Sequence, residues 1–301
     1  MYEIENLDPQ DYEKWLDHCK EVFVNASRSY FKMHFENDPD RFMSSILVIK
    51  DKSQIASAVR VFHRRSFFGG KVFSMGGIGE VATKEEYRGK GMAGELLSAA
   101  VSCMERYGME ISQLGAGSQV IDYYAKKGWR SVPYSERTVK KPDSDTPGVI
   151  LKHLDPKKSL PLLTLLYGKY ASEYYGTLCR SDAYFESWAL PTLVNLTGAY
   201  ENGELCGYVS HRNGICLECI GPNRLHKTLL SAITPKEDGT IVIPGYISGV
   251  YEQESQNVKK SYMLRLLRPI TLNEELVTSS NRLATCITEH GGFSYFKGDN
   301  F

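Results

Sequence analysis

The sequence has no excess of charge of either sign and no long apolar run. It contains 36 basic and 36 acidic side chains among 301 residues, so its formal net charge at pH 7 is zero. A general nucleic-acid or membrane-surface binder usually carries a basic excess, so we expect neither kind of partner. No stretch of about 18 apolar residues occurs that would span a bilayer. Residues 1–16 lack the basic and apolar regions of a secretory signal.

The cysteines give no sign of a disulfide framework. There are seven, an odd number, and they are scattered over the chain. This pattern is typical of reduced thiols in a cytoplasmic protein. Cys216 and Cys219 form the one close pair, but a zinc ribbon would need a second pair. The surrounding residues read as a strand, which favours packing over redox chemistry, and we expect no metal.

Length and pattern predict two α/β units. With 42% hydrophobic residues, 301 residues can build more than one core. We expect a first domain over 1–141, a polar linker over 142–148 and a weaker α/β pattern over 149–270. Residues 271–301 should form a last helix, near 271–285, and a tail. Within the first domain, 45–83 reads as three strands and 129–141 as its final strand.

One short segment carries most of the chemical information. Residues 85–97, EEYRGKGMAGELL, place Arg88, Lys90 and three glycines ahead of an apolar helix. A helix N-terminus leaves backbone N–H groups unpaired and carries about half a positive charge. Glycines let an anion approach these donors, while the two basic side chains add formal charge. The segment therefore predicts a cradle for a pyrophosphate.

Three phosphate-binding designs can be compared with this turn. A P-loop needs Ser or Thr directly after its lysine, but Gly91 follows Lys90. The dinucleotide fingerprint is met by Gly89, Gly91 and Gly94, yet an extended hairpin precedes it instead of the first strand of a βαβ unit. The third design fits best, because residues 88–93 match Arg/Gln-x-x-Gly-x-Gly/Ala.

That motif resembles the acetyl-CoA signature of the GNAT N-acetyltransferase superfamily. The segments GGIGEVATKEEYRGKG and YYAKKGWR are similar to its fourth strand and its later Tyr-x-x-x-Gly-aromatic segment. The resemblance implies a mixed sheet flanked by helices over roughly 1–141. A narrower similarity to Eis-type acetyltransferases implies a second, degenerate GNAT-like α/β domain. Unlike those enzymes, only 34 residues follow MLRLL, too few for a full sterol-carrier-like domain.

The resemblance assigns an acetyl-CoA site residue by residue. The strand before the loop would pair with the pantetheine arm, and the loop backbone would take the pyrophosphate. The next helix would contact the cofactor at its start. The cofactor-binding residues expected on these grounds are Val81, Ala82, Thr83, Arg88, Gly89, Lys90, Gly91, Met92, Ala93, Gly94, Gln119 and Val120.

Catalytic residues follow from the same comparison. Tyr124 stands four residues before Gly128, where the family carries a phenol that protonates the leaving thiolate. Its neighbour Tyr123 is expected to pack. The Eis-type resemblance makes the terminal carboxylate of Phe301 a candidate base, while a frayed terminus is the alternative. Glu80 and His63 are further candidates, although a strand glutamate is more often a surface residue.

The sequence thus predicts an acetyl-CoA-dependent N-acetyltransferase acting on a primary amine by direct attack in a ternary complex. The alternative is a non-catalytic acetyl-CoA-binding or scaffolding protein. The presence of both the loop and Tyr124 favours the enzyme, because a pure binder needs no proton donor. The sequence does not identify the acceptor amine or the task of the second domain. It also leaves the oligomeric state open, and a homo-oligomer is one of the alternatives.

Overall fold

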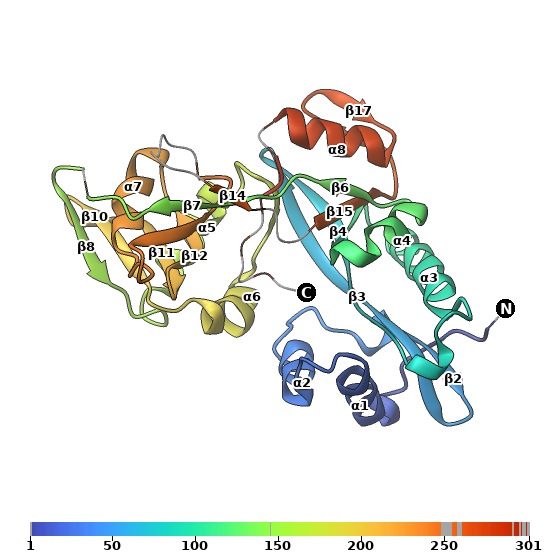
Figure 1. The fold of residues 1–301 in the computed structure, drawn as a ribbon. Coiled ribbons are helices and arrows are strands. Elements are labelled where there is room, and N and C mark those ends of the chain that lie inside the picture. Colours follow the sequence, from blue (N-terminus) through green and yellow to red (C-terminus); the bar gives the residue numbers. More distant parts are fainter. Residues whose placement is uncertain are drawn as a thin grey trace.

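Two sheets flanked by helices make up the protein (Figure 1). The computed structural model describes residues 2–144, 146–247, 255–257, 261–290, 292–294, 296 and 299. The expected mixed α/β architecture is confirmed. Within these residues no helix combines the length and apolar character that a membrane crossing needs.

In the described part of the chain, the first sheet has eight strands, and one of its pairs is parallel. That pair is β4 with β5, whereas every other pair is antiparallel. The order is β1-β2-β3-β4-β5-β15-β6, with β9 paired to β3. The strands are β1 (Glu5–Asn6), β2 (Ile46–Asp51), β3 (Gln54–Phe68), β4 (Lys71–Thr83), β5 (Ile111–Ala116), β6 (Arg130–Val132), β9 (Tyr175–Leu178) and β15 (Ser261–Leu266).

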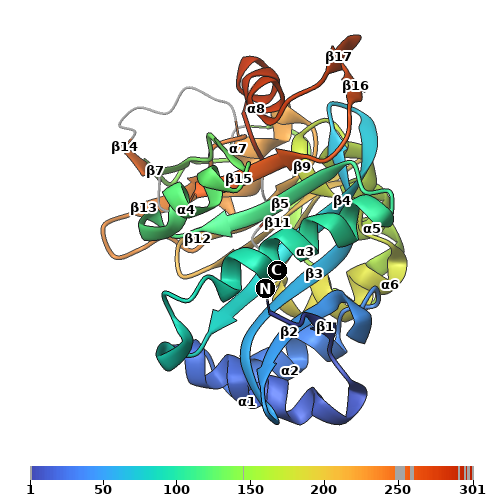
Figure 2. The same ribbon diagram turned by 90° about the vertical axis from the view of Figure 1, so that its right-hand side faces the viewer.

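Helices cover both faces of this sheet. On one face α1 (Tyr12–Val22) and α2 (Arg28–Glu36) bury Trp15 and Phe35 against β2 and β3. On the other face α3 (Met92–Arg106) packs Leu96 and Leu97 on the opposite side chains of the same strands. Figure 2 shows α3 crossing the sheet, with α1 and α2 together at the lower side. The alternation of side chains along β3 supplies both cores.

Strand β4 separates from β5 before it ends. The pairing with β5 runs from Met75–Ile111 to Ile78–Leu114, but β4 continues to Thr83 alongside β3. A register shift in the β3–β4 pairing falls at Glu80, whose φ is +52°. A β-bulge of this kind bends a strand and redirects a side chain. Among the described residues, the stretch from residue 79 to Thr83 therefore pairs with β3 alone and leaves its other backbone edge uncovered by a strand.

The two sheets exchange strands. The region expected as one final strand, 129–141, is two strands: β6 stays in the first sheet, and β7 (Glu136–Lys140) pairs with β13 in the second. In return β15 inserts between β5 and β6, while β9 pairs with β3. The sheets thus do not divide at the expected boundaries, because backbone pairing over long sequence separations decides membership. Each sheet needs chain from both halves.

The second sheet has seven strands in the order β14-β7-β13-β12-β11-β10-β8. Cys216 and Cys219 are buried on β12, so the close pair packs in a core as expected. The other strands of the second sheet are β8 (Val149–His153), β10 (Thr197–Glu201), β11 (Glu204–Arg212), β12 (Ile215–Ile220), β13 (Thr240–Pro244) and β14 (Ser255–Asn257). The helices in this half of the chain are α5 (Leu160–Ala171), α6 (Asp182–Tyr184), a π-helix (Phe185–Ala189) and α7 (Asn223–Ser231).

The helix expected near 271–285 begins later. Residues Ile270–Leu272 (β16) and Glu275–Val277 (β17) form a hairpin, and α8 runs over Ser280–Glu289. Asn273 and Glu274 have φ of +47° and +66°, which makes the hairpin turn. The Ser279 hydroxyl then accepts from the amide of Arg282 and caps α8.

The described residues of the tail are anchored between the sheets. Phe293 is buried beside Tyr262, and Phe296 packs against Tyr167 and two further tyrosines of the second core. The buried Asp299 carboxylate accepts from Arg180 Nε at 2.9 Å. Apolar burial and an ion pair thus hold Phe293, Phe296 and Asp299 in place.

We expect Phe296→Ala to lower the free energy of unfolding by about 3–5 kcal/mol, because it removes a fully buried aromatic ring. Urea unfolding measures this change. Leu276→Ala, at a side chain that is 63% exposed, is the control and should cost less than about 0.5 kcal/mol. Equal stabilities for the two variants would show that the tail is not packed in the core.

Candidate active site

The glycine turn forms the start of α3. Gly91 caps the helix with φ +84°, and Gly89 has φ +75°. A Cβ at either position would meet no atom within 4 Å, so space lies beside both residues. The amides of Gly94 and Glu95 donate to the carbonyl of Gly91. In the described part of the chain, the amides of Met92 and Ala93 have no backbone acceptor.

A groove of about 400 Å³ lies over this turn. Thr83, at the end of β4, and Tyr123, on α4 (Ile121–Lys126), form its two sides. Arg88 Nε donates to the Thr83 carbonyl at 3.3 Å and links the loop to the strand. The other lining residues are Tyr87, Arg88, Gly89, Gly91, Met92, Ala93 and Gly94.

The groove suits a diphosphate that continues into an extended arm. Unpaired N–H groups and the positive end of the helix dipole attract phosphate oxygens. Arg88 and Lys90 are both exposed beside them. The Met92 side chain is buried in the core, so only its backbone faces the groove. The residues present therefore fit the phosphate end of coenzyme A.

The expected pantetheine strand is the uncovered part of β4. Val81 and Ala82 direct their side chains into packed surroundings, and Thr83 Oγ1 bonds to Ser57 Oγ at 2.7 Å. A ligand along the strand edge would therefore meet backbone groups, although the Ala82 carbonyl already accepts from Ser57 Oγ and the Thr83 carbonyl from Arg88 Nε. This geometry agrees with strand addition by an extended arm.

The segment after β5 brings two tyrosines near the turn. Gln119 and Val120 lie in a short 3₁₀ turn that leads into α4, with Gln119 exposed. Tyr124 is partly buried, its ring edge-on to Trp129 with centroids 6.2 Å apart. Burial, with a smaller effect of Tyr123, raises the pKa of Tyr124 to about 12. The phenol therefore stays protonated at neutral pH.

Tyr123 does more than pack. It lines the groove, and its hydroxyl lies 3.5 Å from where a Cβ on Gly94 would stand. Tyr87 lines the groove as well, and its hydroxyl donates to Asp51 at 2.8 Å. Sequence reasoning missed both residues. Tyr123 stands one position before Tyr124, and the sequence alone does not indicate whether its side chain faces the groove or the core.

Glu80 is buried, so the surface interpretation of this residue is wrong. Its side chain is only 6% exposed, and Oε1 lies 3.5 Å from Arg60 Nη1 and 3.6 Å from His34 Nδ1. Its other oxygen, Oε2, is buried without a partner among the described residues. A positive φ and an unpaired carboxylate oxygen at one residue are the kind of strain found at functional sites.

The structure does not bring His63 to Glu80. His63 Nε2 is 2.9 Å from Ser45 Oγ, and the ring packs edge-on to Phe42 and Tyr107. Three positions along β3 from Arg60, it points to the opposite face of the sheet. Phe301 lies outside the described residues. His34, which sequence reasoning missed, contacts Glu80 instead.

Comparison with protein families identifies the first half of the chain. Residues 3–132 match the model described as an acetyltransferase (GNAT) domain. This region is a GNAT acetyltransferase domain. A comparison with curated protein sequences gives no significant match. The GNAT domain holds the glycine turn, the free edge of β4 and Tyr124. Its family implies acyl transfer from acetyl-CoA.

Solved structures share the fold across both sheets. A GCN5-related N-acetyltransferase from Anabaena variabilis aligns with a TM-score of 0.71 and 16% identity, covering 89% of this chain and 73% of that one. A probable N-acyltransferase from Enterococcus faecalis gives 0.73 and 17%, covering 89% and 72%. Eis1 from Mycobacterium abscessus gives 0.62 and 12%, covering 89% and 77%. At these identities the fold is what is shared, and a second GNAT-like domain follows the first.

Replacing Gly91 tests the groove. We expect Gly91→Val to weaken acetyl-CoA binding by at least about 100-fold, because its side chain would stand among the backbone donors. Calorimetric titration measures the affinity. Gly148→Val is a matched control, since Gly148 has φ +79° and equally open surroundings away from the groove. Unchanged affinity in a folded Gly91→Val protein would exclude this site.

Proposed function

We propose that the protein is an acetyl-CoA-dependent N-acetyltransferase that transfers an acetyl group to a primary amine. One observation carries the proposal: the uncovered edge of β4 leads directly into the glycine turn at the start of α3. An extended thioester arm and its diphosphate would find one continuous surface there. When bound, acetyl-CoA supplies an activated acetyl thioester.

The backbone would bind most of the donor. Val81, Ala82 and Thr83 are proposed to pair with the pantetheine arm, and the turn from Arg88 to Gly94 to hold the pyrophosphate. Arg88 and Lys90 add positive charge, while Gln119 and Val120 would border the arm at the start of the next helix. Side chains of Val81, Ala82 and Met92 keep the strand and helix in place by packing.

Tyr124 is the proposed acid. As the amine nitrogen bonds to the acetyl carbon, the carbon–sulfur bond breaks, and the departing sulfur needs a proton. A free thiol titrates near 8.5, so a protonated phenol can donate to the thiolate as it forms. The raised pKa of Tyr124, caused by burial, keeps that proton available.

The amine must lose a proton to a base, and two groups compete for that role. The first is the terminal carboxylate of Phe301, supported by the anchoring of Phe296 and Asp299 two to five residues before it. The second is Glu80, whose free Oε2 lies in the strained bulge of β4. The structure argues against His63 as the base, because its side chain lies on the other face of the sheet.

A direct assay separates the enzyme from a non-catalytic acetyl-CoA binder. Release of free thiol is followed with a panel of polyamines, aminoglycosides and lysine peptides, and mass spectrometry counts acetyl groups on each amine. We expect one acetylated amine per thiol released. Tight acetyl-CoA binding without turnover on the whole panel would favour the binder. We place this reaction in the cytoplasm, as the cysteine pattern suggests.

We expect Tyr124→Phe to lower turnover by roughly 100-fold while acetyl-CoA affinity is retained, since only the proton donor is lost. Steady-state kinetics and calorimetry measure the two quantities. Tyr107→Phe, at an exposed tyrosine on the far end of α3, is the control. Near-normal turnover of Tyr124→Phe would transfer the role to another donor.

The dependence of activity on pH tests the role of Tyr124 in a second way. Because the pKa of Tyr124 is raised, its proton is present at lower pH and is lost only as the pH rises through about 12. Activity should therefore rise with pH as the amine and the base deprotonate. A decline between pH 8 and 10 that Tyr124→Phe abolishes would contradict the raised pKa of Tyr124, because it would place the loss of this proton in that range.

The tail offers a test of the base. A C-terminal tag, or deletion of Phe301, should cut activity sharply with little change in melting temperature. Deletion withdraws the carboxylate by up to roughly 3.5 Å. Phe301→Leu keeps the carboxylate in register and serves as the control. A tagged protein as active as the untagged one would leave Glu80 as the base.

A further inference from the structure

Buried polar atoms near the split between β4 and β5 lack hydrogen-bond partners. Within the described residues, Gln113 on β5 has no partner at either side-chain atom, Oε1 or Nε2, and Glu80 on β4 has none at Oε2. Gln113 has essentially no exposed surface. Buried polar groups in native proteins are nearly always paired, so an unpaired amide in the interior calls for a ligand or a water that completes it. The mechanism proposed above uses Glu80 but not Gln113.

Gln113 lies at the base of the split. It pairs in register with Gly77, and the next pair, Ile78 with Leu114, is the last one between the two strands. One strand residue spans about 3.3 Å, so Gln113 stands a single step before the strands separate. The donor arm proposed along the free edge of β4 would end at this point. The amide therefore belongs to the acyl end of the donor and not to its phosphate end.

The Gln113 side chain lies on the face of the sheet that carries α1 and α2. Leu114 packs in the core under α3, and side chains alternate along a strand, so Gln113 points to the opposite face. The Glu80 carboxylate is on that same face, because it contacts His34 of α2. Tyr124, the proposed acid, packs with the α3 core instead. Gln113 thus shares the face of the candidate base Glu80, from which an amine would approach the acyl group.

Glycines adjoin Gln113 on this face. Its register partner on β4 is Gly77, and the next residues on the same face are Gly79 of β4 and Gly115 of β5. Beyond Gly77 the row continues with Phe62 of β3, whose side chain is apolar. None of these positions supplies a polar side chain that could pair with the amide, and the three glycines place no β-carbon beside it. A ligand group that reaches this face meets the amide over bare backbone.

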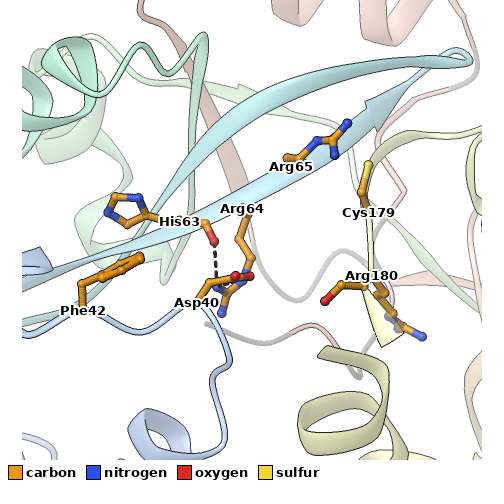
Figure 3. Close-up of a pocket in the computed structure, with 8 residues that line it drawn as sticks. Asp40, Phe42, His63, Arg64, Arg65, Cys179 and Arg180 are labelled. Carbon is orange, nitrogen blue, oxygen red and sulfur yellow. Dashed lines mark hydrogen bonds and ion pairs between the residues drawn. The ribbon is translucent and has the colours of Figure 1, made fainter. Parts of the chain in front are cut away.

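Buried charges elsewhere between the sheets are already balanced. A cavity of about 370 Å³ beside β3 is lined by Arg64 and Arg180 among other residues (Figure 3). Arg64 donates to Asp38 at 2.9 Å, and Arg180 donates to Glu218 at 2.6 Å. These guanidinium groups need no ligand to hold their charge. The unpaired amide of Gln113 is therefore the stronger indication of a ligand contact.

A primary carboxamide would satisfy both side-chain atoms of Gln113. Oε1 accepts a hydrogen bond and Nε2 donates one. A ligand carboxamide presents an N–H and a carbonyl oxygen side by side, so it can pair with both atoms at once. An ammonium group can only donate and a carboxylate can only accept, so either would leave one atom of Gln113 unpaired.

We propose that the acceptor is an amine that also carries a primary carboxamide, which Gln113 holds while the amine attacks the acetyl group. This inference rests on the proposed function and names the class of its acceptor. Gln113 is then a specificity-determining residue of the acceptor side, and the donor is bound without it.

Two pairs of small amines test this assignment. In each pair an isopropyl group of the same shape replaces the carboxamide: glycinamide is compared with isobutylamine, and β-alaninamide with isopentylamine. The ratio of kcat/KM for the amide to kcat/KM for the alkylamine is measured in wild type and in Gln113→Met, which keeps the side-chain length. We expect the variant to lower this ratio at least about tenfold in one pair or both, since two hydrogen bonds to the acceptor are lost. Comparing ratios between proteins cancels the different basicities of the amines.

Gln54→Met, at an exposed glutamine that begins β3, is the control and should keep the wild-type ratios. Gln113→Leu is a second variant with the same expected result, should the methionine variant not fold. The affinity for acetyl-CoA should be the same in all of these proteins. A loss of acetyl-CoA affinity in the folded Gln113 variants would assign the residue to the donor and overturn the proposal.

Unchanged ratios in the Gln113 variants would also overturn it, because the amide would then hold only a water. The same conclusion follows if other amines are acetylated but none of these four is. Failure of the proposed function gives a different result, in which no amine of any class is acetylated by the wild-type protein.

Discussion

The separation of β4 from β5 is the constraint on which the rest of the site depends. Beyond Ile78 the two parallel strands no longer pair, and the bulge at Glu80 bends β4 away. This exposes a strand edge to a ligand and turns a carboxylate into the protein. A sheet that paired along its full length would have neither feature, because each backbone group would already have a partner.

The groove requires α3 as well as β4. The apolar face of α3 packs on β2 and β3, which fixes its N-terminus beside the end of β4. Arg88 then joins the loop to Thr83. Backbone donors, a strand edge and a partly buried phenol are thereby held by the same core, so the site needs little reorganisation to receive an extended ligand.

The second half of the chain completes the first. It supplies β15 and β9 to the first sheet, and its buried Arg180 holds Asp299 near the end of the chain. Trp188, on the π-helix, packs against His34 with ring centroids 4.4 Å apart. The second half of the chain is therefore packed into the first sheet and does not form a separate unit beside it.

Local features of the fold could be predicted from the sequence, and long-range ones could not. The glycine turn, the apolar face of α3 and the position of Tyr124 follow from neighbouring residues and matched spacing. The burial of Glu80 depends on a bulge set by pairing with β3. The insertion of β15 depends on pairing between residues about 150 positions apart. The helix expected near 271–285 failed because the turn at Asn273 and Glu274 outweighed helical spacing.

Amide hydrogen exchange with and without acetyl-CoA tests the central claim most directly. If the donor lies along β4 and over the glycine turn, slower exchange should appear within residues 81–83 and 89–94, because the N–H groups there that lack a backbone acceptor in the described residues, such as those of Met92 and Ala93, gain one. Amides of the second sheet should exchange at unchanged rates. Saturating acetyl-CoA that leaves residues 81–83 and 89–94 unprotected would contradict the account.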